Sequence, residues 1–135
     1  MQLEIVKLKS GYGKVQILHG VNIKIPHGEV TTVLGPNGAG KSTLMKTIAG
    51  HLPVMSGEIS QNGKKLNDLG PLEICKSGIG YVPQDSNVFA ELTVKDNLQV
   101  SSFAFEGSNE RVDEVLKRFP CLLYTSPSPR DTVRS

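Results

Sequence analysis

The stretch GPNGAGKST, from Gly35 to Thr43, is the strongest indication of fold in this 135-residue chain. It matches the pattern G-x-x-x-x-G-K-[ST], in which glycines let the backbone curl until successive N–H groups point inward. The β-branched run VTTVL precedes it, and apolar residues follow at i, i+4 and i+8 from Leu44. The pattern therefore predicts a strand over 30–35, a glycine-rich loop, and a helix that begins near Lys41.

A loop of this kind binds the phosphate groups of a nucleotide, because its inward N–H groups and the positive end of the following helix attract anions. Lys41 supplies a mobile positive charge for the β- and γ-phosphates, and the hydroxyl group of Ser42 can ligate Mg²⁺. A glycine-rich turn that matches the pattern by chance is disfavoured by the strand before it and the helix after it. The stretch thus predicts a nucleotide site that uses Mg²⁺.

The rest of the chain predicts strands that alternate with helices. Period-two apolar runs predict strands at the start of the chain and again over 21–25, and Asn62-Gly63 predicts a hairpin turn. A further strand is predicted over 78–84, with helices over 92–105 and 109–119. This alternation around a strand–loop–helix unit favours an α/β fold with an antiparallel portion at its N-terminal end.

Composition and charge exclude several classes of protein. The chain carries 15 Lys and Arg against 13 Asp and Glu, a formal charge of +2, and no basic run typical of nucleic-acid binding. No apolar stretch is long enough to span a bilayer, and the N-terminus does not resemble a secretory signal, so a cytosolic protein is expected. Cys75 and Cys121 form neither a metal-ligand spacing nor a disulfide framework.

Two further residues are candidates for the site, each with a plainer alternative. Tyr12 lies in the sequence GYG between two predicted strands, where its ring could stack on an adenine base or simply pack at the rim of the sheet. Gln84 ends the predicted strand GIGYVPQ, where it could act on a bound nucleotide or be an ordinary solvated loop residue.

Taken together, these motifs resemble the ATP-binding subunits of ABC transporters. The family order is an aromatic residue, then GPNGAGKST, then a strand that ends in the Q-loop glutamine, then LTV.DNL, and all four occur here in that order. The stretches GYGKVQILHGVN and RVDEVLKRFP are most similar to the subunits of branched-chain amino-acid importers. The resemblance covers residues 1–120 and implies a P-loop NTPase core.

The resemblance implies a role for each matching residue. Tyr12 would stack on adenine, residues 37–43 would cradle the phosphates, and Gln84 would sense the metal and water while it faces the membrane subunits. The implied nucleotide-binding residues are Tyr12, Gly35, Asn37, Gly38, Ala39, Gly40, Lys41, Ser42 and Thr43. Lys41 and Gln84 would be catalytic, with Ser42 and Gln84 at the metal. The implied cofactors are ATP and Mg²⁺.

Implied partners are membrane permease subunits and a second ATP-binding subunit, with which the chain would form a dimer. The protein would then be cytoplasmic and peripheral on the inner face of the plasma membrane, held there by the permeases. No nucleic-acid partner is expected.

Some expected residues do not occur in these 135 residues. His19, His27 and His51 do not fit the family's catalytic histidine, and Asp85 does not follow an apolar strand as a metal-holding aspartate would. The LSGGQ-type signature, the aspartate after the Walker B strand and the catalytic glutamate are also absent. The fold is therefore predicted to be truncated before the signature and Walker B.

The last fifteen residues, CLLYTSPSPRDTVRS, have no hydrophobic period. They could be a disordered tail or a set of proline-directed phosphorylation sites. The interpretation that we favour is that codons for Cys121–Asp131 match a transposase adapter used in sequencing libraries. Residues 1–120 are therefore predicted to be a partial ATP-binding domain, and 121–135 to be adapter read-through rather than a domain.

The predicted function is that of an ATP-binding subunit, in fragment, which couples ATP binding and hydrolysis to import of a solute, by resemblance branched-chain amino acids. Two alternatives stay open: an ABC ATPase without a permease, and a nucleotide-binding fragment with no turnover. The family implies ATPase activity, whereas the chain as written is predicted to be inactive because most of the residues for phosphoryl transfer are missing.

Overall fold

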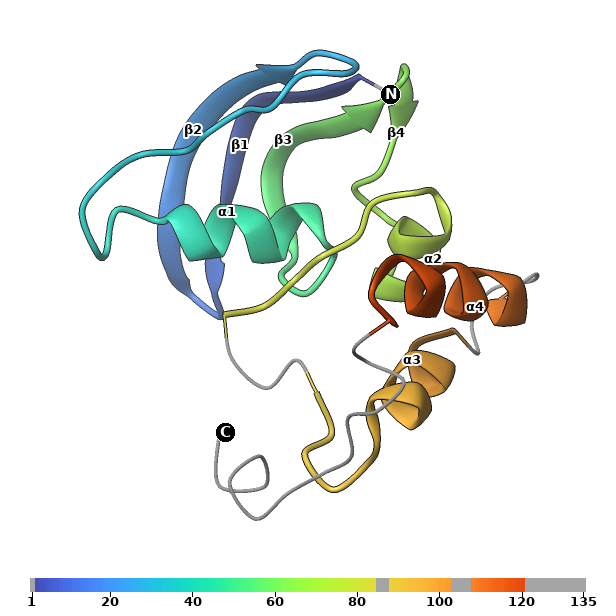
Figure 1. The fold of residues 1–135 in the computed structure, drawn as a ribbon. Coiled ribbons are helices and arrows are strands. Elements are labelled where there is room, and N and C mark those ends of the chain that lie inside the picture. The colour runs from blue at the N-terminus through green and yellow to red at the C-terminus, as the bar shows by residue number, and fades with distance from the viewer. Residues whose placement is uncertain (1, 85–87, 103–107, 121–135) are drawn as a thin grey trace. The chain divides into compact units, whose positions relative to one another are not determined.

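The computed structural model describes residues 2–84, 88–102 and 108–120 of the chain. The chain divides into two compact units, Met1–Tyr81 and Val82–Ser135, whose elements are labelled in Figure 1. The first unit holds the strands and the glycine-rich loop, and the second holds the two C-terminal helices.

The first unit is built on a four-stranded antiparallel sheet in the order β2-β1-β3-β4. Its strands are β1 (Leu3–Tyr12), β2 (Val15–Ile25), β3 (Val54–Gln61) and β4 (Lys64–Lys65). Helix α1 (Lys41–Ile48) lies across one face of this sheet and contacts β1 and β2 (Figure 1). The N-terminal antiparallel portion, the hairpin at Asn62-Gly63 and the helix after the glycine loop are thereby confirmed.

A bulge in β1 explains why its buried residues change phase. Leu3 and Ile5 are buried, but the next buried residue is Leu8, and the pairing register shifts between Ile5 and Leu8. Lys7 has φ 48°, and across the sheet Gly57 has φ 86°. A Cβ atom at Gly57 would lie 2.3 Å from the carbonyl oxygen of Lys7, so only glycine allows this approach.

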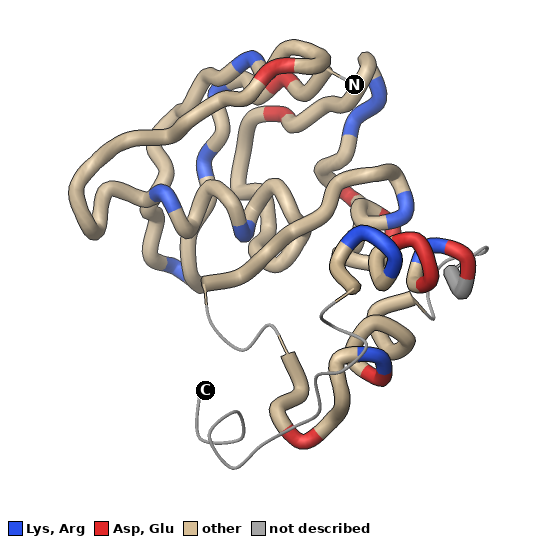
Figure 2. Tube along the Cα trace, viewed as in Figure 1, with Lys and Arg blue, Asp and Glu red and all other residues tan. Residues whose placement is uncertain are grey.

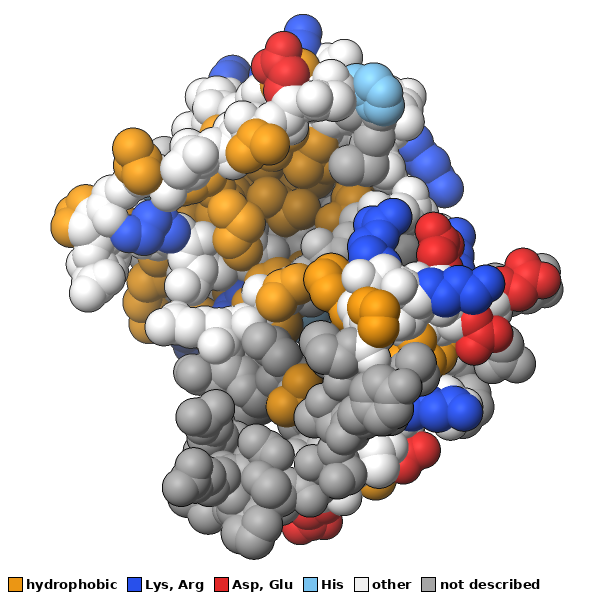
Figure 3. Space-filling model, in the orientation of Figure 1, with side chains coloured by type: hydrophobic (Ala, Val, Ile, Leu, Met, Phe, Trp, Pro, Cys, Tyr) orange, Lys and Arg blue, Asp and Glu red, His pale blue; other side chains and the backbone are white. Residues whose placement is uncertain are grey.

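The predicted strands over 30–35 and 78–84 are wrong, because neither segment forms a strand or helix. A β-branched segment becomes a strand only when a neighbour supplies its backbone hydrogen bonds, and within the described ranges β1 to β4 pair only with one another. Val30 is 96% exposed and Leu34 is 86% exposed as a result. Figure 3 shows hydrophobic side chains lining a hollow in the first unit.

Helix α2 (Pro71–Lys76) in the first unit was not predicted, although its start carries recognisable signals. Proline occupies the first turn, where its missing N–H is no loss, and Glu73 complements the positive end of the helix. Within the described parts of the chain, none of the helices is both long and apolar enough to cross a membrane.

The second unit contains α3 (Val94–Ser102) and α4 (Ser108–Arg118), which pack on each other and confirm the two predicted C-terminal helices. Residues 103–105 of the first predicted helix lie outside the described residues. Helix α3 begins after Thr93, whose Oγ1 accepts a hydrogen bond from the backbone N–H of Asp96 at 3.1 Å. Val112 and Leu116, four residues apart on α4, are buried.

Asn97 organises the loop that precedes α3. Its Oδ1 accepts a hydrogen bond from the backbone N–H of Phe89 at 2.7 Å. Its Nδ2 donates to the carbonyl oxygens of Phe89 at 3.0 Å and Thr93 at 2.9 Å. With a longer bond to the carbonyl oxygen of Leu92 at 3.3 Å, one side chain therefore contacts four backbone groups, which is a physical reason for asparagine in the LTVKDNL stretch.

Candidate functional site

The segment between β2 and α1 ends in the glycine-rich loop, whose turn needs glycine. Gly38 has φ 85° and Gly40 has φ 97°, and the N–H of Ala39 donates to the carbonyl oxygen of Pro36 at 3.2 Å. Gly40 stands at the N-cap position of α1 and provides no side-chain cap. No capping side chain therefore occupies the first N–H groups of α1, and they can donate hydrogen bonds to an anion.

The loop is seated against the strand β2. A Cβ atom at Gly40 would lie 3.0 Å from Cδ2 of Leu18 and 3.4 Å from Cγ2 of Ile17. Leu18 is buried in the core of the first unit, so this close approach ties the start of α1 to the sheet. A side chain at Gly40 would push the loop away from its support.

A cavity of about 360 Å³ opens over the loop and the start of α1. Its lining residues are Ile17, Asn37, Gly38, Gly40, Lys41, Ser42 and Thr43. The structure thus brings together six of the predicted phosphate-binding residues. Gly35 and Ala39 belong to the same loop, where a Cβ atom at Gly35 would lie 3.5 Å from that of Ala39.

Ile17 lines the cavity, although it is not among the site residues predicted from the sequence. It is a half-buried residue of β2, and the only signal available was its position in the strand after Tyr12. An apolar side chain beside a phosphate loop offers contact to the uncharged part of a nucleotide.

The electrostatic character of the site is basic. The Nζ of Lys41 folds back over the loop, donating to the carbonyl oxygen of Gly35 and, at 3.4 Å, to that of Pro36. Helix α1 carries Lys41 at its start and Lys46 in its last turn, with no Asp or Glu (Figure 2). The positive charges and the N-terminal end of α1 therefore both attract an anion at the loop.

Tyr12 ends β1 with its side chain 45% exposed, and its hydroxyl contacts α1. The Nζ of Lys46 donates to the Tyr12 hydroxyl at 3.3 Å and lies 5.6 Å from the ring centre. This hydrogen bond, with a smaller one from Thr43, lowers the pKa of the Tyr12 phenol below its usual value. Since Thr43 also lines the cavity, the ring stands beside the loop.

The remaining candidates from the sequence are Gln84, Asp85 and the three histidines. Gln84 belongs to the second unit and its side chain is exposed, so its role stays a prediction. Asp85 lies outside the described residues. His19, His27 and His51 are exposed, as expected of surface residues, and the ring of His51 lies 5.4 Å from that of Tyr81.

The donor set for a metal is small. Ser42 is exposed and lines the cavity, and among the described residues no three His, Cys, Asp or Glu side chains gather into a metal site. Mg²⁺ bound to a nucleotide needs only one or two protein ligands, because phosphates and water complete its octahedron. The Ser42 hydroxyl therefore fits Mg²⁺ that arrives with a phosphate ligand, where the ion would neutralise phosphate charge.

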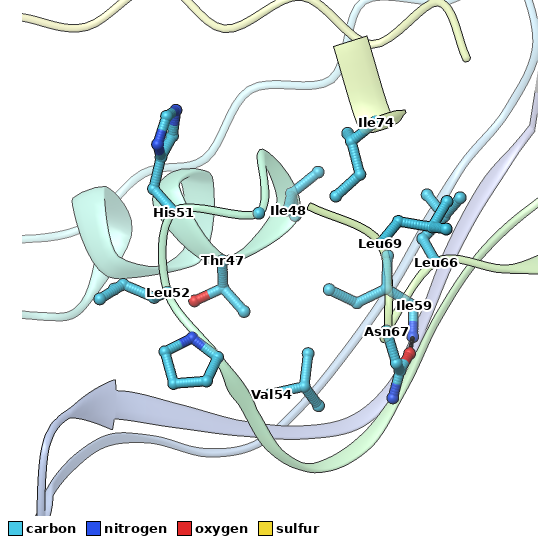
Figure 4. Close-up of a pocket in the computed structure, with 12 residues that line it drawn as sticks. Thr47, Ile48, His51, Leu52, Val54, Ile59, Leu66, Asn67, Leu69 and Ile74 are labelled. Carbon is cyan, nitrogen blue, oxygen red and sulfur yellow. Dashed lines mark hydrogen bonds between the residues drawn. The ribbon is translucent and has the colours of Figure 1, made fainter. Parts of the chain in front are cut away.

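A second cavity, of about 290 Å³, lies between the end of α1, β3 and α2 (Figure 4). Its walls are mostly apolar, and its polar side chains already have partners. Asn67 accepts a hydrogen bond from the N–H of Ile59 at 2.9 Å and donates to the carbonyl oxygen of Gly57 at 2.9 Å. Thr47 contacts Ser10. Unlike the loop cavity, this space offers no set of charged groups for a ligand.

A family profile described as "ABC transporter" matches residues 18–132, which include the loop, α1 and both C-terminal helices. The chain belongs to the ABC transporter family. Membership of this family implies nucleotide binding. The match runs past residue 120, the predicted end of the ATP-binding domain. That domain boundary stays a prediction.

Two relatives have names that refer to branched-chain amino-acid transport. The chain is 43% identical over 120 residues to the probable branched-chain amino acid transport ATP-binding protein LivF of Archaeoglobus fulgidus, covering 87% of this chain and 51% of that protein. It is 39% identical over 122 residues to the high-affinity branched-chain amino acid transport ATP-binding protein BraG of Pseudomonas aeruginosa, covering 89% and 52%. The chain therefore spans about half the length of these relatives.

Other relatives have names that refer to different solutes. The ribose import ATP-binding protein RbsA of Lacticaseibacillus paracasei is 39% identical over 98 residues, which cover 73% of this chain and 20% of that protein. Among solved structures, the ADP conformation of MJ1267, an ATP-binding cassette of an ABC transporter, matches with a TM-score of 0.76 and 27% identity. It covers 100% of this chain and 59% of that one, which confirms the predicted P-loop NTPase fold of the ABC type.

Proposed function

We propose that the loop cavity binds ATP together with Mg²⁺, and that the protein is the ATP-binding subunit of an ABC importer. The observation that carries the proposal is the loop cavity itself. An uncapped helix N-terminus, two left-handed glycines and the basic side chain of Lys41 converge on one space of about 360 Å³. This arrangement suits a polyphosphate.

Each residue at the cavity takes a role that its position supports. Residues 37–43 hold the phosphates through backbone N–H groups, and Lys41 turns from its loop carbonyls toward the β- and γ-phosphates. The Ser42 hydroxyl ligates Mg²⁺. Tyr12 stacks on adenine, with Ile17 as an apolar contact for the nucleoside.

Gln84 takes the role of sensing the metal and the attacking water, on the strength of its place in the sequence. In the complete protein, ATP hydrolysis would then be coupled to import through permease subunits and a second ATP-binding subunit. The subunit would be held on the inner face of the plasma membrane. Phosphoryl transfer of this kind depends on positioning and charge stabilisation rather than on covalent chemistry by the protein.

Branched-chain amino acids are the proposed solute, since the names of two relatives that match most of this chain refer to them. The test is to delete the gene in its source organism and measure uptake of radiolabelled leucine and of radiolabelled ribose. Leucine uptake should fall and return with the wild-type gene but not with the Lys41→Ala gene. Unchanged leucine uptake, or a loss confined to ribose, would refute the proposed solute.

Residues 121–135 are proposed to come from adapter DNA, on the strength of their codon match alone. The test is to amplify the locus from source DNA and read across the codon for Pro120. A different sequence after that codon is expected. If the codons for CLLYTSPSPRD directly follow the codon for Pro120 in the genome, the adapter origin is refuted.

A further inference from the structure

Lys46 has a specific partner that phosphate binding does not require. It is partly buried in the last turn of α1, and its Nζ donates to the hydroxyl of Tyr12 at 3.3 Å. The same nitrogen lies 5.6 Å from the centre of the ring, so the ammonium group is at the hydroxyl end of the tyrosine. The centre of the ring is thereby left available for another contact.

The contact joins two elements that a buried hydrogen bond already holds together. The hydroxyl of Thr47, next to Lys46 on α1, donates to that of Ser10 on β1 at 2.9 Å, and both residues are buried. The end of β1 is therefore fixed against α1 from within. Lys46 and Tyr12 make the outer contact between the same two elements.

We propose that Lys46 is a positioning residue, which holds the ring of Tyr12 beside the phosphate loop in the orientation that a nucleotide base needs. This inference rests on the proposed function, in which Tyr12 stacks on adenine. An exposed tyrosine side chain that is free to rotate must be ordered when a ligand binds, and a partner that orders it beforehand removes that cost.

The size of the effect follows from the contact that is lost. One hydrogen bond accounts for roughly a threefold to tenfold change in affinity. The change should affect the base-dependent part of binding more than the phosphate-dependent part, because Lys46 contacts the Tyr12 hydroxyl and does not line the loop cavity.

The experiment measures dissociation constants of the full chain for Mg·ATP and for Mg-bound inorganic tripolyphosphate, which lacks the base. The variants are Lys46→Met, Tyr12→Phe, the double variant, and Lys46→Arg, with Lys64→Met as a control for an exposed lysine in β4. Circular dichroism confirms that each variant is folded. Tyr12→Phe keeps the ring and removes the hydroxyl that Lys46 contacts, together with its smaller hydrogen bond to Thr43.

We expect Lys46→Met and Tyr12→Phe each to weaken ATP binding about threefold to tenfold, with no further loss in the double variant. Tripolyphosphate binding should stay within about twofold, and Lys46→Arg should retain most of the ATP affinity because arginine can still donate. Equal losses for both ligands, additive losses in the double variant, or unchanged ATP binding by Lys46→Met would overturn the proposal. A wild-type chain that binds neither ligand would refute the proposed function itself, and the inference with it.

Discussion

The hydroxyl groups of Thr47 and Ser10 are hydrogen bonded to each other in the interior of the first unit, 2.9 Å apart. Ser10 also donates to the carbonyl oxygen of Pro53 at 2.7 Å, and Thr47 lies 2.7 Å from the carbonyl oxygen of Thr43. This short polar chain runs from β1 to the helix that begins at the phosphate loop. Because buried hydroxyl groups need hydrogen-bond partners, this chain fixes the position of α1 on β1.

Replacing Thr47 with valine should lower the free energy of unfolding by about 1–2 kcal/mol, because the shape is kept and a buried hydrogen bond is lost. Thr47→Ser is the control, since it keeps the hydroxyl. Urea unfolding of Thr47→Val, Ser10→Ala and the double variant would give a coupling energy of about 1 kcal/mol. A coupling energy of zero would show that the two hydroxyl groups do not support each other.

Gly40→Ala should destabilise the chain more than Gly20→Ala, although both glycines have nearly the same positive φ, 97° and 93°. A Cβ atom at Gly40 would meet Leu18 at 3.0 Å, whereas one at Gly20 has nothing within 4 Å. The shared backbone strain costs about 1–2 kcal/mol, and the contact with Leu18 adds to it only at Gly40. Chemical unfolding of both variants measures the difference, and equal losses would show that the loop is not seated on β2.

Lys46→Met should raise the pKa of the Tyr12 phenol, because the Lys46 hydrogen bond is the main cause that lowers it. Ultraviolet titration of the tyrosines, with Tyr12→Phe subtracted, measures this change directly. A lowered pKa in the folded state adds stability that is fully present at pH above the ordinary tyrosine pKa, and this stability is lost as the pH falls through the folded value. The titration of Tyr12 therefore contributes nothing at neutral pH. A pKa unmoved by Lys46→Met would contradict the contact.

Asn97→Ala should expose the backbone N–H of Phe89 to hydrogen exchange, because its acceptor at 2.7 Å is removed. We expect faster exchange at Phe89 and a loss of about 1–2 kcal/mol in the stability of the second unit, since the carbonyl oxygens of Phe89 and Thr93 also lose one of their two donors. Gln99→Ala on the same helix is the control. Unchanged exchange at Phe89 would mean that Asn97 does not hold the loop.

Local patterns predicted those elements whose partners are close in the sequence. The loop, α1 and the hairpin at Asn62-Gly63 depend on glycines and on helix spacing within a short stretch, and all three form as expected. The strands predicted over 30–35 and 78–84 failed for the opposite reason. A strand of this composition depends on neighbours elsewhere in a sheet, and none within the described residues pairs with either segment.

The site also combines features set by neighbouring residues with features set by residues distant in the sequence. The glycine pattern predicted a phosphate loop at Asn37 and its neighbours, and these residues line one cavity because they are close together in one loop. Contacts across the fold, such as Ile17 against Gly40 and Lys46 against Tyr12, carry no short-range signal. They arise because β2 and α1 are packed together, which a single sequence does not reveal.

Calorimetric titration of the purified chain with Mg·ATP measures whether the loop at Gly35–Thr43 binds the phosphates of ATP. We expect saturable binding at one site. Lys41→Ala should weaken it more than tenfold, because a charge-assisted contact is lost, while circular dichroism and binding by the control Lys24→Ala stay unchanged. Wild-type affinity in Lys41→Ala, or no binding by the wild-type chain, would contradict the account.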